Sequence, residues 1–228
     1  MPKPDAVLFD LDGTLYDERQ VRRAMLPRLA GAALLGGGPR LLRTVQAYRF
    51  ARESLRGRVF PTGDALSAAH RALAAERARV PGEAVARVAE EWLERRPLGA
   101  VGRAARPGLR ELFQWLVDRG IRVGVFSDHP VEGKLEALGV LDLVACHRSA
   151  FSPDVGAFKP EPVGFMRLAE ELGLEAARCW VVGDRDDCDG AAADAVGMRF
   201  LLVGSRPAAA HRERLKSLAG LKGEIERA

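Results

Sequence analysis

Apolar residues are spaced in two different ways along this chain, and the spacing changes near residue 105. Residues 6–9 form a short continuous apolar run, which is typical of a strand buried on both faces. From residue 17 to about residue 96, apolar positions recur every three or four residues and predict helices. We expect four helices in this part, at residues 17–32, 41–55, 64–79 and 81–92, with no strand between them.

Beyond residue 105 the chain alternates between short apolar runs and helical spacing. Strands are predicted at residues 121–126, 143–146, 179–182 and 200–203. Helices are predicted at residues 107–116, 131–138, 162–172 and 190–196, and the tail from residue 207 suggests a fraying surface helix. This alternation predicts an α/β fold with a parallel sheet covered on both faces. The stretch 97–102, with sequence PLGAVG, is typical of a linker between the two parts.

Polar and acidic residues follow the predicted strands. Those of chemical interest are Asp10, Asp12, Ser127, Lys159, Asp184 and Asp189. Because the carboxyl ends of parallel strands meet at one edge of a sheet, we expect these side chains to converge. Carboxylates clustered there would repel one another unless a cation lay among them, and their oxygens suit Mg²⁺. The two acids before Gly13 would also suit a hairpin turn, but the later stretches argue against that interpretation.

Composition excludes several classes of function. The net charge is only +4, and the 35 basic residues are interleaved with 31 acidic ones, which argues against a nucleic-acid-binding face. The longest apolar run lies between Arg28 and Arg40 and is too short to span a bilayer, so no membrane partner is expected. The three cysteines lack metal-ligand spacing, and no signal peptide opens the chain, so we expect reduced thiols in a cytoplasmic protein. Nothing in the sequence specifies an oligomeric state.

Four stretches in order resemble the motifs of the haloacid dehalogenase (HAD) superfamily, in its phosphatase branch. Residues 10–14, DLDGT, resemble the first motif, and Ser127 after the strand 121–126 resembles the second. Lys159 within GAFKPEP (156–162) resembles the third, and GDRDDCD (183–189) the fourth. The resemblance covers nearly the whole chain outside the helical insert. It implies a Rossmann-like core from residues 1–14 and 105–228, with residues 15–104 as a C1-type four-helix cap.

The same resemblance implies roles for the matching residues. Asp10 would attack the phosphorus of a small phosphorylated substrate, forming an aspartyl-phosphate, and Asp12 would act as general acid and then as general base. Ser127 and Lys159 would hold the phosphoryl oxygens. Mg²⁺ would be bound by Asp10, the backbone carbonyl of Asp12 and Asp184, while Asp189 would hold the water shell of the metal.

Elementary electrostatics agrees with these roles. Mg²⁺ and Lys159 together would offset the repulsion between an attacking carboxylate and a phosphate dianion. An acid–base pair also needs two different pKa values, so we expect metal ligation to keep Asp10 ionised. Crowded negative neighbours are expected to raise the pKa of Asp12 and hold its proton.

Several alternatives remain open from the sequence. A capped sugar phosphomutase would share every core residue, and a non-catalytic HAD-fold binding protein is a third possibility. Dehalogenases and phosphonate hydrolases resemble the first motif without its second Asp, so Asp12 favours phosphoryl-ester chemistry. Other polar residues are interpreted as structural or solvated: His129 as a packing or surface residue, Asp186 and Asp187 as loop charges, and Arg22, Arg49, Arg52 and Arg56 as a solvated helix face.

Overall fold

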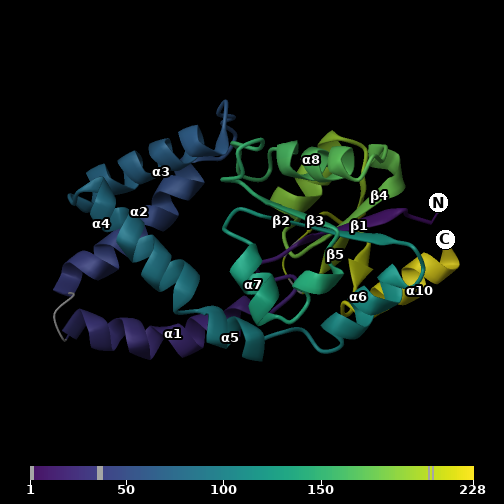
Figure 1. Cartoon of the computed structure of the whole chain (residues 1–228), viewed down its shortest axis with the longest axis horizontal. Helices are drawn as coiled ribbons and strands as arrows, with labels where there is room; N and C mark the ends of the chain where they lie inside the picture. Colours follow the sequence, from purple (N-terminus) through teal and green to yellow (C-terminus); the bar gives the residue numbers. More distant parts are fainter. Residues whose placement is uncertain (1–2, 35–37, 205, 207) are drawn as a thin grey trace.

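A computed structural model describes residues 3–34, 38–204, 206 and 208–228. Within them, parallel strands form a six-stranded sheet in the order β3-β2-β1-β4-β5-β6 (Figure 1). The strands are β1 (Ala6–Asp10), β2 (Arg122–Ser127), β3 (Cys146–Ser149), β4 (Cys179–Gly183), β5 (Arg199–Val203) and β6 (Arg214–Leu215). The expected parallel α/β sheet is therefore confirmed, and β1 occupies its interior between β2 and β4.

Both faces of the sheet are buried, which explains why its strands are apolar without alternation. Val7 and Phe9 of β1 face one apolar layer, which also contains residues of α6 (Leu109–Val117), α7 (Glu132–Ala137) and α10 (Gly220–Arg227). Ala6 and Leu8 face a second layer, formed with α8 (Val163–Glu171) and α9 (Ala191–Ala195). Successive residues of a strand point to opposite faces, so one short run supplies both cores.

Helices fill the segment between β1 and α6. They are α1 (Glu18–Ala32), α2 (Gly38–Leu55), α3 (Gly63–Ala78), α4 (Gly82–Ala89), the π-helical η2 (Glu90–Arg95) and α5 (Leu98–Arg103). Helices α2, α3 and α4 enclose a small core of their own, made largely of alanine with Tyr48 and Val85. Figure 1 shows this group beyond the end of the sheet towards which β1 runs. The four predicted helices correspond to α1–α4.

The predicted linker at residues 97–102 is wrong, because this stretch forms α5. Ala100 and Val101 are buried there in the larger sheet core. Gly102 lies so close to α7 that a Cβ added to it would be 2.6 Å from the carbonyl oxygen of Ala137. The glycine therefore permits close packing of two helices, and does not mark a flexible connection.

Two other predictions at the edges of the sheet need correction. Residues 141–143 form a 3₁₀ turn, and the strand is β3, which begins at Cys146 and not at residue 143. β3 is an edge strand, so it tolerates polar residues that the apolar pattern did not indicate. The tail also contributes β6 and then α10, whose Leu221 and Ile225 are buried. Of the glycine-rich stretch 36–39, residues 36 and 37 lie outside the described residues, and α2 begins at Gly38.

Two global expectations can be compared with the described residues. None of their helices has both the length and the apolarity needed to cross a bilayer. The three cysteines, Cys146, Cys179 and Cys188, are free thiols and all are buried. Buried in this way, they pack as small apolar residues.

Candidate active site

The sheet topology brings the predicted residues to one edge. Asp10 is the last residue of β1, Ser127 is the last residue of β2, and Asp184 directly follows β4. Because β2 and β4 flank β1 in parallel, these three positions lie side by side. All six candidates line a single cavity of about 130 Å³: Asp10, Asp12, Ser127, Lys159, Asp184 and Asp189.

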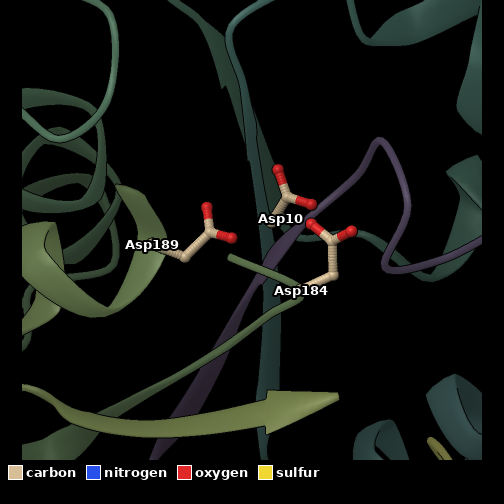
Figure 2. Close-up of side chains that lie close together, drawn as sticks. All are labelled: Asp10, Asp184 and Asp189. Carbon is tan, nitrogen blue, oxygen red and sulfur yellow. The ribbon is translucent and has the colours of Figure 1, made fainter. Parts of the chain in front are cut away.

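Three buried carboxylates form the acidic part of this cavity. Asp10, Asp184 and Asp189 each offer an oxygen atom, and these atoms lie within 4.8 Å of one another. Figure 2 shows the three side chains turning towards a common space from separate segments. Burial, followed by the charge of Asp189, raises the pKa of Asp10 well above its usual range and that of Asp184 to about 6. The oxygen-only donor set and its excess negative charge fit a hard divalent cation such as Mg²⁺.

Lys159 is the buried cation of the site. Its ammonium group donates to Asp10 Oδ1 and, at 2.7 Å, to Asp189 Oδ1. Burial alone would lower the pKa of Lys159, but these two carboxylates outweigh it and raise the pKa well above the usual value. Thr14 adds a hydrogen bond of 2.7 Å from its hydroxyl to Asp10 Oδ2. Asp10 is therefore held in place through both of its oxygens.

Asp12 has a different environment from the one expected. Ser127 Oγ donates to its Oδ2 at 2.7 Å, while Lys134 Nζ and the hydroxyl of Tyr16 donate to its Oδ1. Burial would raise the pKa of Asp12, but the positive charge of Lys134 and these hydrogen bonds outweigh it and lower the pKa far below the usual value. The predicted upward shift is wrong for this state of the protein, because Asp12 has a cation beside it that the motif does not contain.

Lys134 and Tyr16 were not singled out from the sequence. A signal for Lys134 existed, because it lies three residues after Val131 and four before Leu138, on the face of a helix that is otherwise apolar. A lysine at such a position is either solvated at its tip or paired with a buried acid, and here it is paired.

Gly13 permits a close approach between the turn after β1 and a carboxylate. Its φ is +100°, and a Cβ added there would lie 2.3 Å from Asp184 Oδ2. Only glycine combines that backbone conformation with that lack of bulk. The glycine of the first motif thus makes room for an acid of the fourth.

Arg52 of α2, and Arg56 just after the end of that helix, reach the cavity from the helical segment. Arg56 Nη2 lies 3.0 Å from Asp128 Oδ2, and Arg52 Nη1 lies 2.7 Å from His129 Nε2. All four residues line the cavity. The interpretation of Arg52 and Arg56 as solvated is therefore wrong, and His129 is a partly buried residue of the cavity wall. Burial, followed by the charge of Arg52, lowers the pKa of His129 well below its usual value, so the ring is neutral.

Three other expectations have mixed outcomes. Asp187 is exposed and bonds only Arg185 and the neighbouring Cys188 among the described residues, as a loop charge should. Asp186 differs, because it accepts from Arg212 and from the backbone N–H of Ala209 and so anchors the tail. Arg22 lines the cavity at the helical side, although its guanidinium is half exposed and pairs with Glu18.

Two comparisons with known sequences agree with each other on the family. The family model described as haloacid dehalogenase-like hydrolase matches residues 4–197, which is most of the chain. A phosphoglycolate phosphatase from Rhodospirillum rubrum is 30% identical over 220 residues, covering 88% of this chain and 79% of that protein.

Solved structures with the same fold include enzymes of two kinds. A 2-haloacid dehalogenase from Pseudomonas syringae pv. Tomato DC3000 has a TM-score of 0.68 and 21% identity, with 100% of this chain and 99% of that one covered. A HAD phosphatase from Thermococcus onnurineus has a TM-score of 0.66 and 22% identity, covering 99% and 98%. Since this fold carries both reactions, the reaction has to be argued from the residues of the site.

Proposed function

This chain belongs to the haloacid dehalogenase-like hydrolases, and on that premise we propose that it is a Mg²⁺-dependent phosphatase of a small phosphorylated metabolite. The observation that carries the proposal is the joint presence of Asp10, Asp12, Ser127 and Lys159 with two further acids around one cavity. The relative named phosphoglycolate phosphatase supports the same class of reaction. The cavity of about 130 Å³ suits a small substrate.

Asp12 is the residue that favours a phosphatase over a dehalogenase. The resemblance implies that dehalogenases lack this second acid, because their leaving group, a halide, needs no proton. An ester oxygen leaves as an alkoxide unless it is protonated, so a positioned acid speeds its departure. Asp12 is positioned by three donors on three different segments, which supports a role that depends on its orientation.

The metal would be held by Asp10, Asp184 and the backbone carbonyl of Asp12, with Asp189 holding its water shell. The fit rests on the three acids whose oxygens cluster within 4.8 Å. When bound, Mg²⁺ supplies positive charge that stabilises the transferring phosphoryl group.

In the first step, a carboxylate oxygen of Asp10 attacks phosphorus and the bond from phosphorus to the ester oxygen breaks. Asp12 gives its proton to that departing oxygen, so the alcohol leaves neutral. In the second step, Asp12 takes a proton from water, the water oxygen attacks phosphorus, and Asp10 is regenerated as phosphate departs. Dividing one difficult displacement into two easier ones is the benefit of the covalent intermediate.

The low pKa of Asp12 keeps it ionised, as a general base has to be, but also makes it a weak base in the absence of substrate. The first step needs the protonated form. A phosphate dianion bound beside Asp12 brings negative charge next to its carboxylate, and like charge raises the pKa of an acid. We therefore propose that substrate binding offsets the effect of Lys134, so that Asp12 acquires its proton with the substrate in place.

Ser127 and Lys159 would contact the phosphoryl oxygens. The ammonium of Lys159 lies against Asp10 and so is next to the atom that would attack phosphorus. Ser127 Oγ accepts from the backbone N–H of His129 at 3.0 Å and donates to Asp12, so its hydroxyl faces the acid side of the cavity. Fixed donors of this kind stabilise developing negative charge without reorganisation.

We also propose that residues 15–104 act as a cap over the core of residues 1–14 and 105–228. Glu18, Arg22, Arg52 and Arg56 of that segment complete the wall of the cavity. Closing this wall over a bound substrate would exclude water from the phosphoryl group.

The test is a screen of the purified protein against phosphorylated metabolites and p-nitrophenyl phosphate, with free phosphate as the readout. We expect phosphate release with Mg²⁺, none in EDTA, and recovery on adding Mg²⁺. Asp10→Asn should abolish release, while Asp118→Asn, an exposed acid at the end of α6, should retain it. Metal-free turnover, or an active Asp10→Asn variant, would contradict the proposal. Isomerised sugar phosphate without net phosphate release would identify a phosphomutase instead.

A further inference from the structure

A second group of side chains lines the same cavity. It consists of Arg52 on α2, of Arg56, which directly follows the last residue of α2, and of Asp128 and His129, which directly follow β2. The two pairs contact each other one to one, Arg56 with Asp128 and Arg52 with His129. The two arginines nevertheless differ in how many of their donors are used.

Arg56 is fully engaged by the protein. Its Nε and Nη2 bond Glu53, its Nη2 also bonds Asp128, and its Nη1 bonds the carbonyl of Lys159 and lies 3.4 Å from Cys188 Sγ. These contacts account for all five N–H groups of a guanidinium. Arg56 therefore fixes α2 against the loop that carries Lys159, and it has no donor left for a ligand.

Arg52 is only partly engaged. Within the described residues its Nε and Nη2 bond Glu53 Oε1 at 3.2 and 2.9 Å, and its Nη1 bonds His129 at 2.7 Å. Three of its five N–H groups are used in this way. Glu53 is itself half exposed and shared with Arg56, so it neutralises Arg52 incompletely. A positive group with unused donors thus lies in the wall of the cavity.

His129 holds this guanidinium in place. Its neutral ring offers Nε2 as an acceptor to Arg52, and its own backbone N–H is bonded to Ser127. The orientation of Arg52 is therefore coupled through His129 to Ser127, whose hydroxyl donates to Asp12. His129 adds no negative charge to Arg52, whose acidic partner is the half-exposed Glu53, whereas Arg56 is also paired with the buried Asp128.

Resting on the proposed function, we propose that Arg52 binds a carboxylate of the substrate, which is then a small phosphorylated carboxylic acid. Asp10 and Arg52 line the same cavity of about 130 Å³, so a compact substrate attacked by Asp10 can also reach Arg52. The planar fork of a guanidinium matches a carboxylate, and the negative charge of that carboxylate would complete the neutralisation of Arg52 that Glu53 provides only in part.

The experiment compares esters that differ only in the carboxylate. The full-length protein with Mg²⁺ is assayed on 2-phosphoglycolate against ethyl phosphate, and on 3-phosphooxypropanoate against propyl phosphate. A charged hydrogen bond contributes about 1.5–3 kcal/mol, so the wild type should prefer the acid of at least one pair by about 10- to 150-fold in kcat/KM. Arg52→Met should reduce that ratio to near one, mainly through KM, and Arg52→Lys should recover part of it.

Arg43→Met is the matched control, because Arg43 is an exposed arginine on the same helix with no part in the site. It should leave both rates and their ratio as in the wild type. A wild type that hydrolyses both members of each pair equally, or an Arg52→Met variant that keeps the preference, would overturn the role of Arg52 while leaving the phosphatase intact. If neither p-nitrophenyl phosphate nor a single one of these esters releases phosphate, the proposed function is overturned as well.

Discussion

Replacing Lys159 by methionine should destabilise the protein, because the buried carboxylates of Asp10 and Asp189 would lose their compensating positive charge. The ammonium of Lys159 contacts Asp10 and lies 2.7 Å from Asp189, and all three side chains are at least 94% buried. Methionine is an unbranched apolar residue that can occupy this site, where Lys159 Nζ lies 5.5 Å from the ring centroid of Phe126 and 5.9 Å from that of Phe165. The substitution therefore removes chiefly the charge.

The size of the effect follows from that burial. Removing one partner of a buried ion pair costs about 3–5 kcal/mol, because the remaining charge is left without compensation. For a chain of this length, the expected loss corresponds to a fall in Tm of about 6–20 °C. The loss should shrink at low pH. Burial raises the pKa of Asp10, and without Lys159 it rises further, so acid protonates the carboxylate and removes the uncompensated charge.

The assay is urea unfolding followed by tryptophan fluorescence, in EDTA at pH 8 and at pH 5, and at pH 8 with Mg²⁺. Lys159→Met should be much less stable than the wild type at pH 8 and closer to it at pH 5. At pH 8, Mg²⁺ at about 100 times its Kd should raise the free energy of unfolding of Lys159→Met by about 2.7 kcal/mol. Lys216→Met, which changes an exposed lysine, is the control. Equal stabilities of the two variants at pH 8 in EDTA would refute the reasoning.

Three further predictions concern the same site. The pKa of Asp184 is raised to about 6 in the folded protein. Its contribution to the free energy of unfolding is therefore complete below about pH 4 and is lost as the pH rises through 6. Metal-free protein should therefore lose roughly 3 kcal/mol between pH 4 and pH 7.5 in urea titrations, and Asp184→Asn should flatten the curve. Gly13→Ala should displace Asp184 and lower kcat about 10²-fold, whereas Gly139→Ala, at a positive φ with open space, should affect stability alone. Lys134→Met should raise the pKa of Asp12 and so shift the pH profile of kcat/KM to higher pH. An unchanged profile would show that Lys134 does not control the pKa of this acid.

The elements of the core could be predicted from local pattern because their environment is uniform. β1 is covered on both faces, so every residue of its apolar run is buried and the run itself indicates the strand. The apolar pattern gave wrong predictions for two elements that are not covered evenly by apolar residues, β3 and α5. β3 lies at the edge of the sheet and carries His147 and Arg148, while α5 is short and rich in glycine and is ordered by packing against α7.

The six residues of the site could also be predicted, because strand ends in a parallel sheet converge whatever side chains they carry. Their partners could not. Asp12 is bonded by Lys134, which is 122 positions away in the chain, and Arg56, just after α2, bonds Asp128, which is 72 positions away. No local spacing encodes such pairs, and the ionisation of a buried acid depends on them more than on its own motif.

The parallel sheet, the helical insert and the set of acids and donors at the sheet edge could thus be predicted without the structure. These features follow from periodicity and from the order of motifs along the chain. The fold was needed to show that Asp12 is held as a carboxylate, that every donor of Arg56 is bonded, and that Arg52 has unused donors among the described residues. Charge and hydrogen-bond partners are set by distances of a few ångströms, and those distances exist only once the chain is folded.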